Sequence, residues 1–200
     1  TGTGKTVTLQ IMAEGFSVQG VPVFCADIKG DLSGIAKPGS ETFKLHEAFT
    51  SRASKIGFED YTYHDVPAVF WDVFGEKGHS VRSTIAEMGP TLLSRLMNLS
   101  ETQEGVLTVA FEYADDENLL LLDLKDLQKL LIHLGDKEVR DEVSLRYGNV
   151  ASASLSAIQR SLLQLEREGA EQFFGEPALN LDHLMRTADD GRGIVNVLDA

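Results

Sequence analysis

The sequence predicts an α/β fold with a largely helical insertion, and three observations lead to this prediction. A glycine-rich start precedes an apolar helix and then an apolar segment typical of a buried strand. A second strand-like segment closes the chain, and about a hundred residues with helical periodicity begin near Val81. Strands at both ends with helices between them are typical of a sheet that carries an insertion. We place the first part of the core at residues 1–75, the insertion at 76–190 and a returning core strand at 191–200.

The first elements follow from apolar patterning. Apolar residues from Val7 onward predict a helix, and Gly15 is its expected end. Residues 21–25 are expected to form a buried strand, and residues 66–72, short and aromatic, a further one. Residues 35–66 have weak periodicity and are expected to be loops with one short helix near 41–51.

The insertion is predicted to consist of several helices. Gly89 and Pro90 should interrupt the first, and Ser100 with Gln103 forms the capping-box pattern of the next. Asp123 is the expected start of an amphipathic helix over residues 124–134, although its apolar preamble also suits a strand end. Residues 136–150 are charged and expected to be exposed, and further helices are expected at 151–168 and 181–186, before a strand over 194–199.

The first six residues, Thr1, Gly2, Thr3, Gly4, Lys5 and Thr6, match the second half of the phosphate-binding pattern G-x-x-x-x-G-K-[ST]. Successive backbone N–H groups of such a loop point inward and form a nest for phosphate oxygens. The helix that follows adds its positive dipole end and unpaired donors. Lys5 is predicted to neutralise the β- and γ-phosphates of ATP, and the Thr6 hydroxyl to bind Mg²⁺. A chance glycine-rich turn is the alternative, which the loop–helix–strand order disfavours.

The chain begins inside this motif and has no initiating Met, so we expect it to be a piece of a larger protein. The leading glycine of the pattern would lie two residues before Thr1. Hydrolysis also requires an acidic residue at the end of an apolar strand, often followed by Glu as the base. Four aspartates end apolar runs, and none of them is followed by Glu: Asp27, Asp72, Asp123 and Asp199.

Two further groups of polar residues are candidates. Asp27, Lys29 and Asp31 belong to a loop with two glycines after the first predicted strand. This loop is either a tight turn in which Gly30 has a positive φ, or a polar ligand-binding loop at the carboxyl end of a parallel strand. Spacing alone leaves both alternatives open. Arg192, in a glycine-flanked turn, is a candidate finger that reaches a neighbour's nucleotide, with a surface arginine as the commoner alternative.

Composition limits the other classes of function. Lys plus Arg is 18 and Asp plus Glu is 31, for a net charge of −13. Such a surface repels the phosphate backbone of nucleic acids, so we do not expect this stretch to bind nucleic acid by itself. The single Cys25 indicates a reducing compartment, and we expect a cytoplasmic protein with no membrane partner. The five histidines are scattered without metal-ligand spacing.

Together with the phosphate loop, several stretches make the chain resemble the bacterial "helicase HerA-like, C-terminal" family, within the HerA/FtsK superfamily of P-loop ATPases. These stretches are residues 27–31, 71–78, 87–90, 103–107, 120–127 and 173–179. The resemblance implies a RecA-like P-loop core, incomplete here, and, for better-studied relatives, a hexameric ring that moves along DNA. It also implies that the metal carboxylate and its base lie downstream of Ala200.

On this basis we expect ATP and Mg²⁺ as cofactors, and a homo-oligomeric ATPase in the intact protein that drives DNA translocation or helicase-like remodelling. This stretch is expected to be inactive by itself. Two alternatives remain open. One is an ATP-dependent regulator or assembly factor that acts on protein, which the acidic balance favours. The other is a nucleotide-binding module that does not hydrolyse.

Overall fold

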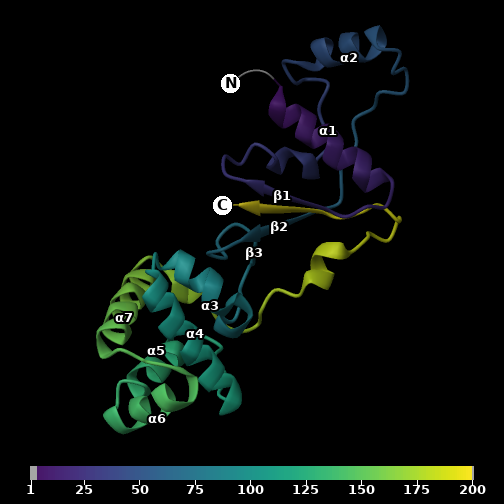
Figure 1. Ribbon diagram of the computed structural model, residues 1–200. Helices are drawn as coiled ribbons and strands as arrows, with labels where there is room; N and C mark the ends of the chain where they lie inside the picture. Colours follow the sequence, from purple (N-terminus) through teal and green to yellow (C-terminus); the bar gives the residue numbers. More distant parts are fainter. Residues whose placement is uncertain (1–3, 200) are drawn as a thin grey trace. The chain divides into compact units, whose positions relative to one another are not determined.

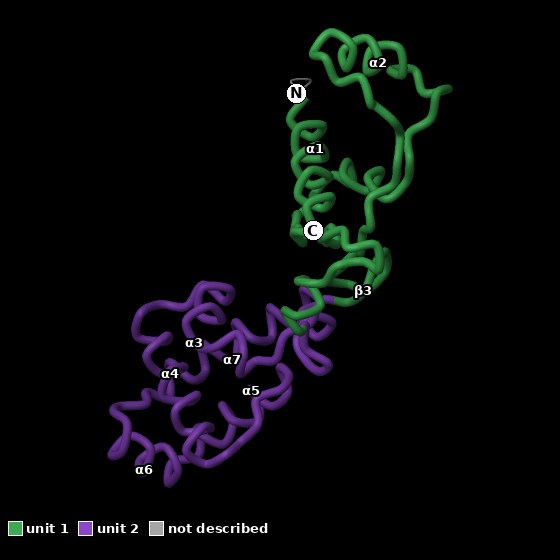
Figure 2. The backbone as a smooth tube through the Cα atoms, turned by 90° about the vertical axis from the view of Figure 1, so that its right-hand side faces the viewer, with its two compact units in different colours: residues 1–80, 180–200 green, residues 81–179 purple. Residues whose placement is uncertain are grey.

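The computed structural model describes residues 4–199, and within it the chain forms two units (Figure 2). One comprises residues 1–80 and 180–200, and the other residues 81–179. The first contains a parallel sheet and the second is helical, so the molecule is a mixed α/β protein. The domain boundaries that the sequence predicts at residues 75 and 190 remain predictions.

The first unit is built around four parallel strands in the order β1-β4-β2-β3 (Figure 1). Their bounds are β1 Val23–Asp27, β2 Ala68–Asp72, β3 His79–Ser80 and β4 Val195–Asp199. β4 is central and largely buried, as the apolar composition of parallel strands requires. The segments predicted at 66–72 and 194–199 are therefore strands, while the first strand begins two residues later than its predicted start.

Helix α1 (Lys5–Val18) runs antiparallel to the strands, from the edge where the strands end toward the edge where they begin (Figure 1). Gly15 does not end it, contrary to the sequence prediction. The helix continues because Gly20, with φ of 78°, provides the left-handed residue at its end. The buried Ser17 hydroxyl then donates to the Gly193 carbonyl at 2.6 Å, which fixes this end of the helix beside the start of β4.

The remaining elements of this unit are η1 (Ser33–Ala36), α2 (His46–Lys55) and η3 (Leu181–Met185). One polar residue, Asn196 of β4, is completely buried in the sheet. Its amide oxygen accepts from the Trp71 indole N–H at 2.9 Å, and its amide nitrogen donates to the Leu184 carbonyl at 3.0 Å. Because both the oxygen and the nitrogen of the Asn196 amide have hydrogen-bond partners, the side chain links β2, β4 and η3 without leaving its own polar atoms unpaired.

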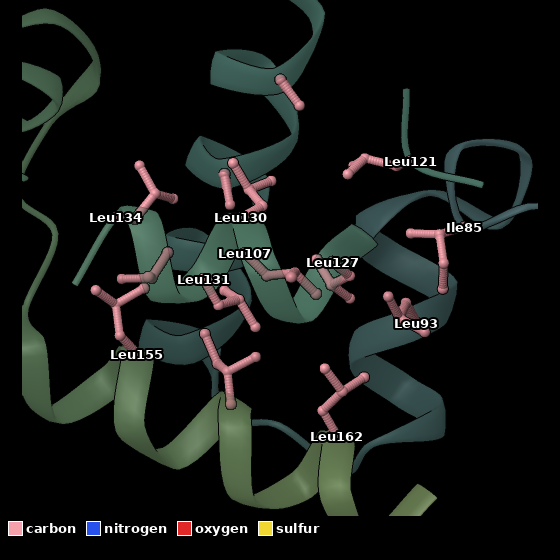
Figure 3. Close-up of a cluster of buried hydrophobic side chains, with 14 of the residues drawn as sticks. Ile85, Leu93, Leu107, Leu121, Leu127, Leu130, Leu131, Leu134, Leu155 and Leu162 are labelled. Carbon is pink, nitrogen blue, oxygen red and sulfur yellow. The ribbon is translucent and has the colours of Figure 1, made fainter. Parts of the chain in front are cut away.

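The second unit packs six helical segments around one apolar core (Figure 3). They are α3 Ile85–Leu96, α4 Glu101–Asp116, α5 Leu124–His133, α6 Lys137–Tyr147, α7 Ser152–Arg167 and η2 Ala170–Gln172. The predicted capping box of Ser100 and Gln103 and the Asp123 cap are both confirmed. α3 has a non-helical residue at Gly89, where the sequence predicted an interruption. Helix α6 was not predicted from the sequence, because its residues are mostly charged and Val143 is its one buried residue.

Candidate functional site

The candidate residues that the structure describes lie mostly at the carboxyl edge of the parallel sheet. α1 begins at this edge, so Gly4, Lys5 and Thr6 lie on the side where β1, β4 and β2 end (Figure 1). Asp27 is the last residue of β1, and its loop extends from the same edge. Thr1, Gly2 and Thr3 are outside the described residues. Open parallel sheets bind their ligands at the carboxyl edge.

Gly4 opens α1 in a conformation that few other residues adopt. Its φ is 77° and its ψ is 15°, and among residues 4–199 no atom outside its own chain segment lies within 4 Å of where a Cβ would be. Its carbonyl accepts from the Thr8 backbone N–H at 2.9 Å and from the Thr8 hydroxyl at 3.1 Å. No side chain caps this helix start, and its first turn contains no acidic residue. The positive end of the α1 dipole is therefore not neutralised by a carboxylate from its own first turn.

Asp27 holds its own loop together. One carboxylate oxygen accepts from the backbone N–H groups of Lys29 and Asp31, at 3.3 and 3.2 Å. The other accepts from the Leu32 N–H at 2.8 Å. Gly30 has a φ of 72°, as the tight-turn interpretation required. The loop is therefore a tight turn that also extends from the carboxyl end of a parallel strand, with the Lys29 and Asp31 side chains exposed.

Helix α1 and this loop are in direct contact. The Gln10 side-chain amide donates to the Asp31 carbonyl at 3.1 Å. Gln10 lies between one and two turns after Lys5 on α1. The contact therefore ties the loop after β1 to the same helix whose first residues carry the phosphate-binding pattern.

The loop after β2 has the same construction, which was not predicted from the sequence. Asp72 ends β2, and its carboxylate accepts from the backbone N–H groups of Phe74, Glu76 and Lys77, each at 2.8 Å. These N–H groups, with that of Lys77 first, hold the pKa of the Asp72 carboxyl below its ordinary value. Gly75 has a φ of 68°. The shared signal is an apolar strand followed by D-x-x-G and an acidic residue, which occurs from Asp27 and again from Asp72.

Three aspartates end neighbouring strands in the same register. Asp27 pairs with Asp199, and Asp199 pairs with Asp72, so Asp199 is in the middle of the row. Its carboxylate accepts from the Lys77 ammonium group at 2.7 Å instead of from backbone N–H groups. This partner raises the pKa of Lys77 above its ordinary value. The ion pair between Lys77 and Asp199 was not predicted, because 122 positions separate the two residues in the sequence.

Arg192 is at the opposite edge of the sheet from the other candidates, since it precedes β4. Its guanidinium donates to the Asp190 carboxylate and to the Asp65 carbonyl, each at 2.7 Å. The structure therefore does not bring Arg192 together with Lys5 within this chain. A role at a neighbouring chain's nucleotide remains a prediction.

Two findings describe what is absent between residues 4 and 199. No cluster of three or more histidine, cysteine, aspartate or glutamate side chains there could hold a metal ion. In the same range, every helix is too short or too polar to span a membrane.

Comparison with known proteins identifies a family. The model of the helicase HerA-like C-terminal family matches residues 1–200, which is the family that the sequence stretches indicated. Searches of curated proteins and of solved structures find no match. Because the family model covers the whole sequence, the chain belongs to the helicase HerA-like C-terminal family.

Proposed function

We propose that this chain supplies the triphosphate-binding part of a RecA-like P-loop ATPase. The observation that carries the proposal is the start of α1: a left-handed Gly4, then Lys5 as the first helical residue, with no side-chain cap. An uncapped helix start after a glycine turn is a ready anion site. Family membership supports an ATPase in the intact protein.

The residues present fit a magnesium–nucleotide complex. Gly4 favours close phosphate approach, because it has no Cβ and no described residue beyond its own chain segment comes within 4 Å of that position. Lys5 would neutralise the β- and γ-phosphates, and the Thr6 hydroxyl would bind Mg²⁺. Backbone N–H groups of Thr1, Gly2 and Thr3 would complete the cradle. Bound Mg²⁺ neutralises charge that develops on the phosphates.

Water activation is a separate requirement, and two of the aspartates are poor candidates for it. The carboxylates of Asp27 and Asp72 each accept three backbone N–H bonds. The carboxylate oxygens of both residues already accept hydrogen bonds that hold their own loops together. We therefore assign loop-holding roles to both residues, and we propose that the metal carboxylate and the base come from outside residues 4–199.

For the intact protein we propose a cytoplasmic homo-oligomer, a hexamer by family resemblance, that couples ATP hydrolysis to DNA translocation or remodelling. The net charge of −13 favours a second candidate, an ATP-dependent regulator that acts on a protein. The ATPase rate with and without DNA at low salt separates them. Stimulation by DNA supports the translocase, whereas a DNA-independent rate with a nuclease-resistant protein partner supports the regulator.

The test of the nucleotide proposal is ATP turnover by the full-length protein with Lys5→Ala. We expect hydrolysis to be abolished and the fold to be retained, because Lys5 is exposed on the first turn of α1. The matched control is Lys55→Ala, which removes an exposed lysine at the end of α2 and should leave turnover unchanged. Full turnover by the Lys5 variant would rule the assignment out.

A further inference from the structure

A cavity of about 690 Å³ opens at the carboxyl edge of the sheet in the first unit. Its floor is apolar and consists of Phe70 and Val197, which are register partners on β2 and β4. One wall belongs to the loop after β1 and includes residues 28–30, Ser33 and Gly34. This volume is in the range of small-molecule sites, which are about 300–1,000 Å³. Within residues 4–199, the lining of the cavity includes neither Lys5 nor Thr6.

The charge of the cavity lining is opposite to that of the chain. Three lysines, Lys29, Lys37 and Lys77, and two aspartates, Asp27 and Asp199, contribute charged side chains to it. The Asp27 carboxylate is already bound by three backbone N–H groups of its loop. In a protein with a net charge of −13, this lining therefore has a local excess of ammonium groups.

Two of the three ammonium groups are available to a ligand. Across residues 4–199, neither the Lys29 nor the Lys37 ammonium group has an ion-pair or hydrogen-bond partner. Lys77 differs, because its ammonium group donates to the Asp199 carboxylate at 2.7 Å. The backbone N–H of Lys77 donates to the Asp72 carboxylate, which fixes the backbone of the loop that carries this lining residue.

Three ammonium groups around one cavity match the chemistry of a phosphate group, which lysine binds as a point charge. A single carboxylate ligand would satisfy fewer of them. Without a bound phosphate, the Asp199 carboxylate takes the place of an anionic ligand for one of the three ammonium groups, that of Lys77. An incoming phosphate that takes Lys77 as a partner must displace the Asp199 carboxylate.

We propose that this cavity is a phosphate-binding site, separate from the start of α1. In this site the Asp199 carboxylate is paired with the Lys77 ammonium group until a phosphate group displaces it. The inference does not rest on the proposed ATPase function. It predicts opposite effects for the two members of one ion pair: removing the lysine weakens phosphate binding, and removing the aspartate strengthens it. A purely structural ion pair predicts no effect on phosphate binding from either change.

The test is equilibrium binding of inorganic pyrophosphate to the full-length protein at low salt, with hydrogen exchange as the readout of location. Lys77→Gln and Lys37→Gln should each weaken binding by roughly threefold to tenfold, and Asp199→Asn should strengthen it by about threefold, because charge pairs at a cavity mouth are only partly screened. Pyrophosphate should slow amide exchange in residues 28–37. Lys55→Gln, an exposed lysine outside the cavity, is the matched control and should bind as the wild type does.

Lys5→Ala separates this proposal from the proposed function. If that variant still shows pyrophosphate-dependent protection of residues 28–37, the cavity binds phosphate independently of the start of α1. If Lys5→Ala abolishes all pyrophosphate binding while Lys37→Gln and Lys77→Gln leave it unchanged, the cavity proposal is overturned and the nucleotide proposal stands. Lys37→Gln keeps the test valid if Lys77→Gln disturbs its loop, since the Lys37 side chain is exposed.

A competition arm identifies the source of the phosphate group. A thymidine oligonucleotide that displaces pyrophosphate, with the same dependence on Lys37 and Lys77, assigns the site to a nucleic-acid backbone. Failure to compete assigns it to a small phosphorylated ligand.

Discussion

Replacing Asp27 with alanine should destabilise the first unit, because this buried carboxylate accepts three backbone N–H bonds. The N–H groups of Lys29 and Asp31 are in an exposed loop and can bond to water instead. The N–H of Leu32 cannot, because Leu32 is 6% exposed. Leaving one buried donor unsatisfied costs about 1–3 kcal/mol, so we expect Asp27→Ala to lower the free energy of unfolding by about 1–3 kcal/mol.

The assay is urea denaturation followed by tryptophan fluorescence. Trp71 is the single tryptophan of the 200 residues, is 8% exposed and belongs to β2, so its signal reports the first unit. Asp31→Ala in the same loop is the control and should change the free energy of unfolding by less than about 0.5 kcal/mol, as exposed substitutions usually do. If the two variants are equally stable, the loop-holding role of Asp27 is wrong.

Three further predictions concern packing and ionisation. Leu127→Ala removes a fully buried side chain from the helical core and should cost about 2–5 kcal/mol in thermal or urea unfolding followed by circular dichroism, whereas Leu145→Ala, at a 91% exposed position, should cost little. Because the folded state lowers the pKa of Asp72, the ionised Asp72 carboxylate stabilises the fold fully above its ordinary pKa of 3.8, and this stabilisation is lost as the pH falls through the lower folded value. Asp72→Asn should remove this acid dependence of the free energy of unfolding, measured by tryptophan fluorescence. The hydrogen bond from Tyr147 to Asp116 raises the pKa of Tyr147 to about 12, so its stabilisation is complete below pH 10 and is lost as the pH rises through about 12. Spectrophotometric titration should show this late tyrosine ionisation, and it should disappear in Tyr147→Phe.

Local sequence patterns predicted most of the fold. Apolar runs in the sequence predicted strands β2 and β4. The caps of α4 and α5 were also predicted, because a capping box depends on residues only three positions apart. The end of α1 was wrong because Gly15 is tolerated inside the helix, while the Ser17–Gly193 bond that helps to fix this end spans 176 positions. No sequence window contains that information.

The candidate site was predicted only where its residues are neighbours in the chain. Gly4, Lys5 and Thr6 form a local motif, and Gly30 was correctly given a positive φ as one of two alternatives. The Lys77–Asp199 pair depends on the register of β2 and β4, which sequence periodicity does not specify. The second D-x-x-G loop at Asp72 was available as a repeated pattern, and comparison with the loop at Asp27 would have revealed it.

The most direct test of the central claim is calorimetric titration of ATP with Mg²⁺ into the full-length protein and its Lys5→Ala variant. The proposed triphosphate cradle at the start of α1 predicts one nucleotide bound per chain and at least a tenfold loss of affinity in the variant, which corresponds to about 1.4 kcal/mol. No heat from ATP or ADP with the wild-type protein, or equal affinity in the variant, would contradict it.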